Sequence, residues 1–349
     1  MTLRRTFILI LSVISFSCLS CGHESFFDEE DFVKNGDSIP NKGEEPFDNS
    51  ASKGGTNGTD STSSNTNHTQ TNTDSYLIDT LFRGDIANDT LVYVSGLSKY
   101  MNQTSSGGSV QGAAAYGDYL FQFQDHNAAV FVYNLANKSF VKKITLTPNI
   151  NNHCNQASFS DIFYDKEDNF PLLYVSGART KTYNHIQVYR IIGQNEGITI
   201  EQIQEIILPQ SNKLNWVYWT CIIIDNDNHY LYAYANSNTR LIKFQIPDYK
   251  QSTVYLEDSD IIEFFQLDNI NHQQGGIIYK GYFYMVFGVP SWGDTIWLRV
   301  FDMDKKNELA RFNLSNINFK GEPESIFIYK NELYAATNNA GIYKIIFKK

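Results

Sequence analysis

Short runs of alternating hydrophobic and polar residues recur along the chain from about residue 109 onward, and turns rich in Asp, Asn, Gly or Lys separate them. An alternation with a period of two predicts β-strands rather than helices. Five segments share one outline, in which a polar or small stretch, an apolar run and a turn lead into an aromatic strand. They begin at Ser109, Ser158, Tyr218, His272 and Glu322.

Further alternating strands follow each opening segment at corresponding places. Third strands are predicted at 129–133, 186–190, 241–245, 297–301 and 341–345, and fourth strands at 141–146 and 309–314. Units of about 50 residues with four short antiparallel strands are typical of β-propeller blades. No long helical period interrupts the pattern, which argues against an α/β enzyme fold.

The repeat predicts an all-β propeller of five blades over residues 76–349. The fifth unit has three strands, and we expect residues 90–95 to supply its outer strand. Pairing of these two chain ends closes the ring and leaves no open sheet edge. Six blades are the main alternative, if residues 79–100 form a degenerate blade, and a β-sandwich is the third.

The first 21 residues have the pattern of an export signal. Arg4 and Arg5 precede an uncharged apolar run at 6–19, which is shorter than the roughly 20 residues of a transmembrane helix. The end of this run resembles a bacterial lipobox, with Cys21 as the lipidated residue and Cys18 as the alternative. An ordinary secretory signal with incidental cysteines is the other interpretation. We therefore expect an outer-membrane lipoprotein of the cell envelope, either periplasmic or surface-exposed, whose lipid binds the membrane.

Residues 22–75 have the composition of a tether. An acidic cluster at 28–31 is followed by a tract of Asn, Ser, Thr and Gly at 49–75 that contains almost no apolar residue. Such a segment buries too little surface to offset the entropy of ordering it, so we expect disorder.

The formal net charge of −10 argues against nucleic acid as a partner, because phosphate neutralisation requires a basic face. Cys154 and Cys221 are the cysteines of the repeat region. They could form a disulfide in an oxidising compartment or remain buried thiols. Their surroundings lack the CxxC spacing of a zinc site.

The starts of the innermost strands surround the axial channel of a propeller, so their polar residues are candidates for ligand binding. Aligned on the turns, one ring of equivalent positions contains Gln111, Ser160, Thr220, Gln274 and Glu324. Two positions earlier, and on the same face of each strand, lie Ser109, Ser158, Tyr218, His272 and Glu322. Hydrogen bonding from blade to blade is the alternative role for each of them.

His272, Glu322 and Glu324 are the members of these rings that can bind a metal or move a proton. No cofactor is predicted, although Glu322 and Glu324 could offer two carboxylates to a calcium ion, which takes about six to eight oxygen ligands. Tyr218 with its neighbour Trp219, and separately Trp292, are aromatic groups suited to stacking on a sugar ring or a peptide side chain, and buried packing explains the first group equally well.

Two of the openings resemble a known family. Gln111-Gly112 followed by the aromatic strand at 119–121, and Gln274-Gly275 followed by 282–284, are similar to the blade openings of glutamine cyclotransferases. The resemblance implies a five-bladed propeller. That family places a catalytic glutamate just after this aromatic strand, where the present sequence has Gln122, and an amide cannot act as a general acid or base. The resemblance therefore supports the fold and argues against the activity.

Two classes of function remain, with a purely structural scaffold as a third possibility. The first is a lipid-anchored extracytoplasmic binding protein that presents the channel mouth and loops to a glycan, peptide or protein. The alternative is a hydrolase, lyase or acyltransferase with its active site in the channel, using His272 with Glu322 or Glu324.

Overall fold

The computed structural model describes residues 93–102, 110–124, 129–146, 153–177, 184–209, 219–235, 240–267, 272–317, 319–338 and 341–348. All of them belong to the compact unit Thr69–Lys349. The predicted signal peptide, Cys21, the tether and Tyr218 lie outside the described residues. Within the described ranges, we find no helix with the length and apolar character needed to cross a bilayer.

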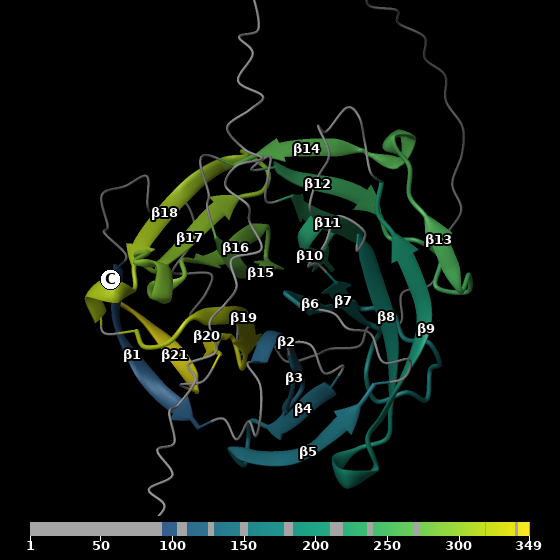
Figure 1. The fold of residues 1–349 in the computed structure, drawn as a ribbon, viewed down its shortest axis with the longest axis horizontal. Coiled ribbons are helices and arrows are strands. Elements are labelled where there is room, and N and C mark those ends of the chain that lie inside the picture. The colour runs from purple at the N-terminus through teal and green to yellow at the C-terminus, as the bar shows by residue number, and fades with distance from the viewer. Residues whose placement is uncertain are drawn as a thin grey trace, which may run out of the picture. The chain divides into compact units, whose positions relative to one another are not determined.

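Five small sheets surround a common axis and form a five-bladed β-propeller, as the repeat predicts (Figure 1). Blade 1 consists of β2 (Val110–Tyr116), β3 (Tyr119–Gln124), β4 (Ala129–Asn134) and β5 (Ser139–Thr145). Blade 2 consists of β6 (Ala157–Phe159), β7 (Leu173–Gly177), β8 (His185–Ile192) and β9 (Thr199–Ile207). Blade 3 consists of β10 (Trp219–Asp225), β11 (Tyr230–Ala235), β12 (Arg240–Gln245) and β14 (Glu263–Gln266). Blade 4 consists of β15 (Gln273–Tyr279), β16 (Tyr282–Phe287), β17 (Trp297–Asp302) and β18 (Asn307–Asn313).

Blade 5 joins the two ends of the propeller. Its strands are β19 (Pro323–Tyr329), β20 (Glu332–Thr337), β21 (Ile342–Lys348) and, as the outer strand, β1 (Tyr93–Met101). β1 runs antiparallel to β21, with Tyr93 opposite Lys348 and Leu97 opposite Ile345 (Figure 1). The predicted closure is confirmed, although the strand lies later than the expected residues 90–95. The six-blade alternative was wrong, because β1 completes blade 5.

One strand lies outside the predicted pattern of four strands per blade. β13 (Thr253–Tyr255) lies between β12 and β14 in the sequence, but it does not join blade 3. It pairs parallel with β9 at the outer edge of blade 2. Thr253 lies opposite Glu205 in this pairing. A three-residue strand of this kind carries almost no periodic signal, and its partner is far from it in sequence.

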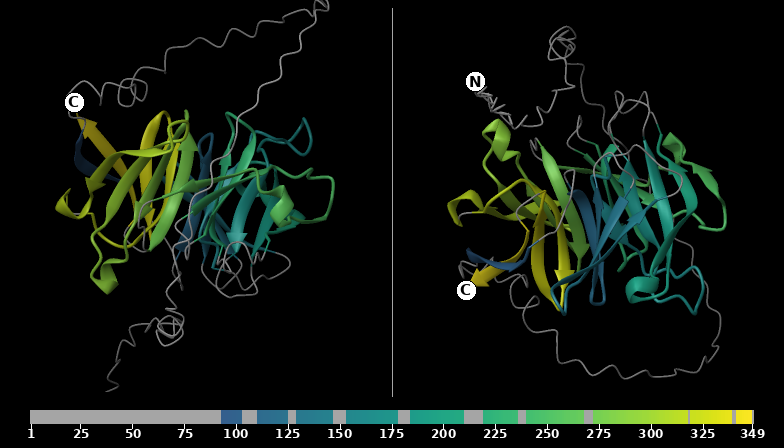
Figure 2. Two further views of the ribbon diagram at one scale, coloured as in Figure 1. Left: turned by 90° about the horizontal axis from the view of Figure 1, so that it is seen from above. Right: turned by 60° about the horizontal axis from the view of Figure 1, so that its bottom comes forward.

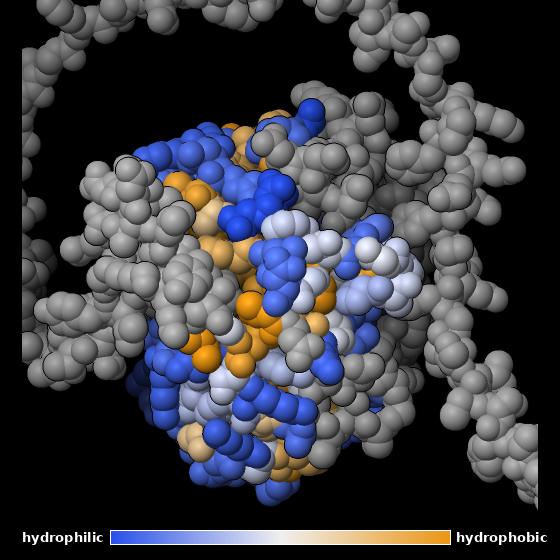
Figure 3. Space-filling model, turned by 90° about the vertical axis from the view of Figure 1, so that its left-hand side faces the viewer, coloured by the Kyte–Doolittle hydropathy of each residue, from blue (hydrophilic) through white to orange (hydrophobic). Residues whose placement is uncertain are grey.

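The hydrophobic core consists of five clusters, and each one fills the space between two neighbouring blades. Between blades 1 and 2, for example, Phe121, Phe123 and Leu173 are fully buried, and Phe170 is buried beside them. Full burial of such side chains contributes about 1.5–3 kcal/mol each. The blades stand side by side in the two side views (Figure 2). The side of the propeller on which β1 and β18 lie in Figure 1 shows hydrophilic groups with hydrophobic ones between them (Figure 3). Phe312 of β18 is one of the half-buried hydrophobic residues.

The glycines of the two Gln-Gly openings allow neighbouring innermost strands to approach closely. A Cβ atom on Gly112 would lie 2.7 Å from the carbonyl oxygen of Cys154 and from the Cα atom of Gln156. A Cβ atom on Gly275 would overlap the backbone of Ser325. The motif that resembles the cyclotransferases therefore serves the packing of the hub in this protein.

Of the two cysteines in the described residues, neither is in a disulfide. Cys154 and Cys221 are buried thiols in different interblade clusters. Burial raises the pKa of the Cys221 thiol, which disfavours the reactive thiolate.

Candidate functional site

The strand register places the predicted hub residues at two opposite ends of the innermost strands. Gln111 lies at the start of β2, whose last residue, Tyr116, pairs with Tyr119. In blade 2 the amide of Ser160 donates to the carbonyl oxygen of Leu172, one step beyond the Phe159 and Leu173 pair. Ser160 therefore corresponds to Tyr116 and not to Gln111.

The alignment of Ser158 and Ser160 with the other ring residues was wrong. It placed the turn of blade 2 at Asp165, whereas β6 ends at Phe159 and β7 begins at Leu173. The long connection shifted the apparent start of the strand. Ser158 instead accepts a hydrogen bond from the amide of Ile224 at 3.1 Å and joins blade 2 to blade 3.

Gln156 occupies the level of Gly112 and Gly275 in blade 2, and sequence reasoning missed it. Ala113, Ala157 and Gly276 are equivalent by register. Each lies three residues before the position next to the turn, which is Tyr116 in blade 1, Ser160 in blade 2 and Tyr279 in blade 4. The Gln156 side chain crosses the hub to blade 4, where Nε2 donates to the Gly276 carbonyl at 2.6 Å and Oε1 accepts from the Gly276 amide at 3.2 Å. One signal in the sequence could have identified Gln156: it is a long polar residue at a position where blades 1 and 4 have glycine.

Three polar side chains meet at the end of the hub where the innermost strands start, which we call the start mouth. Gln274 Nε2 donates to Glu322 Oε1 at 2.7 Å, and Asn338 Nδ2 approaches Glu322 Oε2 at 3.4 Å. The amide of Asn338 also donates to the Glu322 carbonyl at 3.0 Å. Blades 4 and 5 thus hold the Glu322 carboxylate between two side-chain amides. The sequence placed Gln274 and Glu322 in two different rings of candidate residues and did not predict this contact.

His272 lies at the same end, two residues before Gln274. Its Nδ1 atom is 2.6 Å from Oδ2 of Asp294, which also accepts the amide of Val289 at 2.9 Å. The Trp292 ring packs against the His272 ring with centroids 4.8 Å apart and a 76° interplanar angle. A carboxylate that accepts from Nδ1 orients the imidazole and fixes its tautomer. Sequence reasoning missed Asp294 as the partner, because the 288–296 loop folds back onto the start of β15.

The remaining predicted residues are buried or fall outside the described residues. Gln111, Gln274 and Glu324 are buried, with Glu324 at 2% relative exposure, and the fully buried Gln122 pairs with Ala113 and Phe131 in the centre of blade 1. Ser109, Tyr218 and the Thr220 side chain are not described. Among the described residues, no three His, Cys, Asp or Glu side chains are arranged to hold a metal ion.

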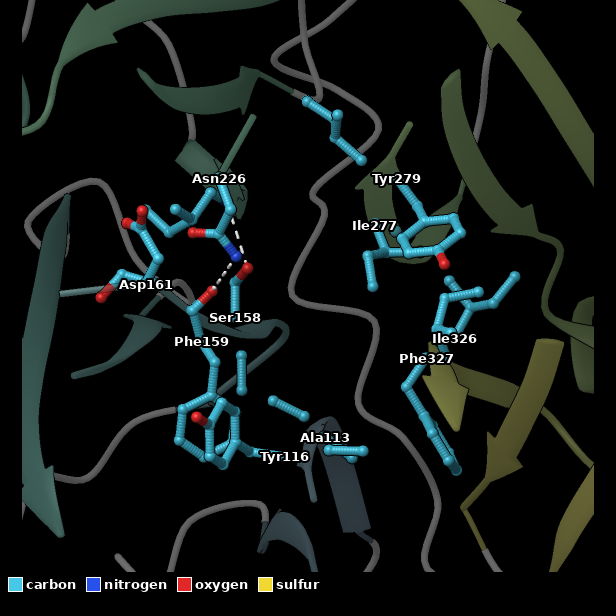
Figure 4. A pocket seen from close by; sticks show the side chains of 18 of the residues that line it. Ala113, Tyr116, Ser158, Phe159, Asp161, Asn226, Ile277, Tyr279, Ile326 and Phe327 are labelled. Carbon is cyan, nitrogen blue, oxygen red and sulfur yellow. Dashed lines mark hydrogen bonds between the residues drawn. The ribbon is translucent and has the colours of Figure 1, made fainter. Parts of the chain in front are cut away.

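The opposite end of the hub is hollow. A cavity of about 340 Å³ lies where the innermost strands end, and all five blades line it (Figure 4). Its residues include Ala115, Phe159, Ile224, Tyr279 and Ile328. We call this opening the end mouth.

Neither the family models nor the curated proteins contain a match to this chain. Solved structures similar to it include the glutaminyl cyclase of Myxococcus xanthus, with 9% identity, 74% of this chain and 96% of that chain covered, and a TM-score of 0.47. A Bacteroides thetaiotaomicron protein of unknown function has 14% identity, coverages of 72% and 76%, and a TM-score of 0.41. The virginiamycin B lyase of Staphylococcus aureus has 14% identity, coverages of 71% and 98%, and a TM-score of 0.40. The resemblance to glutamine cyclotransferases noted in the sequence thus has a counterpart among solved structures. Because these identities and TM-scores are low, we take the number of blades from the sheet topology alone. The two enzyme activities are properties of those proteins.

Proposed function

We propose that the protein is a lipid-anchored extracytoplasmic binding protein whose start mouth binds a glycan. The observation that carries this proposal is Trp292, a residue that is 49% exposed although its ring packs edge to face against His272. Since Asp294 holds His272 through a hydrogen bond, the exposed ring is held in place by its neighbours. A fixed, exposed indole offers a flat apolar face to the C–H groups of a sugar ring.

Polar groups at the same end of the hub suit the hydroxyls of the same ligand. Gln274, Glu322 and Asn338 form one hydrogen-bonded set across blades 4 and 5. Carboxylate oxygens accept hydrogen bonds, and side-chain amides both donate and accept them, which matches the hydroxyl groups of a sugar. Ligand pockets commonly combine apolar surface with a small number of oriented polar groups.

A glycan array probed with the purified full-length protein tests the proposal. We expect selective binding that Trp292→Ala weakens at least about tenfold, as expected when a buried aromatic contact is lost at an interface. Tyr255→Ala is the matched control, because Tyr255 is an exposed aromatic residue on β13 of blade 2. Equal binding by both variants, or no binding to any glycan, contradicts the proposal.

An enzyme is the second candidate, and the hydrogen bond between His272 and Asp294 favours it. A general base needs an oriented imidazole, which this pair provides. The partner is Asp294, whereas the expectation from sequence was Glu322 or Glu324. Mass spectrometry of a bound glycan after incubation separates the candidates: a chemical change that His272→Ala abolishes indicates catalysis, and an unchanged glycan indicates binding.

The anchor and the calcium alternative are proposals with their own tests. Cys21→Ser should move the protein from the membrane fraction to the soluble fraction, while Cys18→Ser should leave it in place, because lipid attachment requires the modified thiol.

A calcium ion at Glu322 and Glu324 should raise the melting temperature above that measured in EDTA, and Glu322→Gln should remove that shift.

A further inference from the structure

The cavity at the end mouth has a different chemistry from the start mouth. Ile277, Tyr279 and Ile326 lie on one side of it and face Phe159 and Asp161 on the other (Figure 4). Its volume of about 340 Å³ falls within the range of small-molecule pockets, which begins near about 300 Å³. Its walls are mainly aliphatic and aromatic.

Blade 1 contributes small residues to the lining of the cavity. Ala113 and Ala115 line the cavity, whereas the equivalent positions of blade 4 hold Gly276 and Ile278 and those of blade 5 hold Ile326 and Ile328. At both positions the side chain of blade 1 is smaller than the isoleucine of blade 5. Protein interiors otherwise contain few voids larger than a water molecule.

The Gln156 bridge separates this cavity from the start mouth. Gln156 directly precedes Ala157 on the chain and bonds Gly276 from the opposite side of the hub. Ala157 and Gly276 are both lining residues of the cavity. The end mouth is therefore a second site, and what it binds does not depend on the ligand of the start mouth.

The charge and the aromatic groups of the end mouth select one kind of ligand. Asp161 and Asp227 are the charged side chains among the described lining residues. Asp161 is 3.3 Å from the ring of His229, and both side chains are solvent-exposed. Lys280 lies near the Tyr279 ring, at 5.5 Å from its centroid, and is not part of the lining. The centroid of the Tyr116 ring lies 5.6 Å from that of Phe159 and 6.3 Å from that of Phe163. These three rings form an aromatic group in the same lining as the carboxylates.

We propose that the end mouth binds a small amphiphilic cation, with an apolar ring system inside the cavity and an ammonium group at the rim. The apolar part replaces water against the isoleucines and aromatic rings. The ammonium group pairs with Asp161 and Asp227 and is attracted to the faces of the neighbouring aromatic rings. An anion of the same shape meets like charge at the rim.

Three naphthalene probes of similar shape test the proposal on the full-length protein by titration calorimetry: 1-naphthylmethylamine, 1-naphthylmethanol and 1-naphthoate. We expect the amine to bind about two- to fivefold more tightly than the alcohol, as for an exposed ion pair, and the carboxylate to bind most weakly. Ala115→Phe should fill the cavity and weaken the amine at least about tenfold. Thr253→Phe adds an aromatic group at an exposed position of β13 and should leave the affinity unchanged.

Asp227→Asn keeps the shape of the cavity and removes one negative charge from its rim. It therefore tests the ion pair separately from the binding of the apolar ring. It should reduce the preference for the amine over the alcohol, with little effect on the alcohol. Circular dichroism melts of each variant show that the propeller is intact. Equal affinity for all three probes overturns the cationic ligand, and binding that Ala115→Phe does not weaken, or no binding of the amine, overturns the site. None of these results depends on the glycan proposal for the start mouth.

Discussion

The side-chain amide of Gln156 forms two hydrogen bonds with the backbone of Gly276 across the hub, at 2.6 Å through Nε2 and 3.2 Å through Oε1. Gln156 belongs to blade 2 and Gly276 to blade 4, so the contact joins two blades that are not neighbours in the ring. It is buried from solvent. A buried backbone amide and carbonyl in this position require such a partner.

We expect Gln156→Ala to destabilise the propeller by about 2–5 kcal/mol, because it leaves two buried backbone groups without partners. Urea unfolding followed by circular dichroism measures the change. Gln194→Ala is the control, since Gln194 is exposed and forms no capping bond to η3 (Asn195–Gly197). A loss below about 1 kcal/mol would mean that water replaces the amide.

Gly275→Ala and Gly112→Ala should each destabilise the protein by about 1–3 kcal/mol or more. In both cases the added Cβ atom meets the backbone of the neighbouring innermost strand. Gly197→Ala should have the opposite sign and stabilise by about 0.4–1 kcal/mol, because nothing lies within 4 Å of its Cβ position. Thermal melts of the three variants compare them, and equal effects would contradict the role assigned to the Gln-Gly openings.

The acid stability of the protein should depend on Asp168. Arg190 donates to both carboxylate oxygens at 2.8 Å, and this hydrogen bonding lowers the pKa of Asp168 below its ordinary value of 3.8, against the opposing effect of burial. A carboxyl group with a lowered folded pKa stabilises the native state above 3.8 and loses that contribution as the pH falls through the folded pKa.

Asp168→Asn should therefore reduce stability at pH 6 and make the fall in stability below about pH 4 less steep. Urea midpoints measured between pH 6 and pH 2 test this. Glu167→Gln, whose parent side chain is 81% exposed, should leave both the midpoint and the slope nearly unchanged. Parallel pH profiles for wild type and Asp168→Asn are the result that contradicts the assignment.

Cys154 and Cys221 should resist thiol reagents in the native state. Cys221 is 0% exposed, and burial raises the pKa of its thiol, so both access and thiolate formation are suppressed. A full-length variant with Cys18→Ser and Cys21→Ser should react with Ellman's reagent only after unfolding, with two thiols per chain. Rapid labelling of either cysteine in the folded protein would show that an interblade cluster opens.

The sequence alone determined the fold class, the number of blades and the closure of the ring. Alternation with a period of two is a local property, and it repeats five times between residues 109 and 349. It located third strands such as β17 to within a residue. The pairing of β1 with β21 followed from the outer strand that the fifth unit needed.

The tertiary structure alone decided which polar residues meet. Ser160 lies at the opposite end of the hub from its predicted position. The length of the connection between β6 and β7 sets the register of blade 2, and the period of the strands does not encode that length. The path of the 288–296 loop brings Asp294 to His272. Gln156 and Gly276 form hydrogen bonds although 120 residues separate them in the sequence. The cavity likewise depends on residues of all five blades. Contacts of this kind depend on how the blades are placed around the axis, so a pattern confined to one strand cannot predict them.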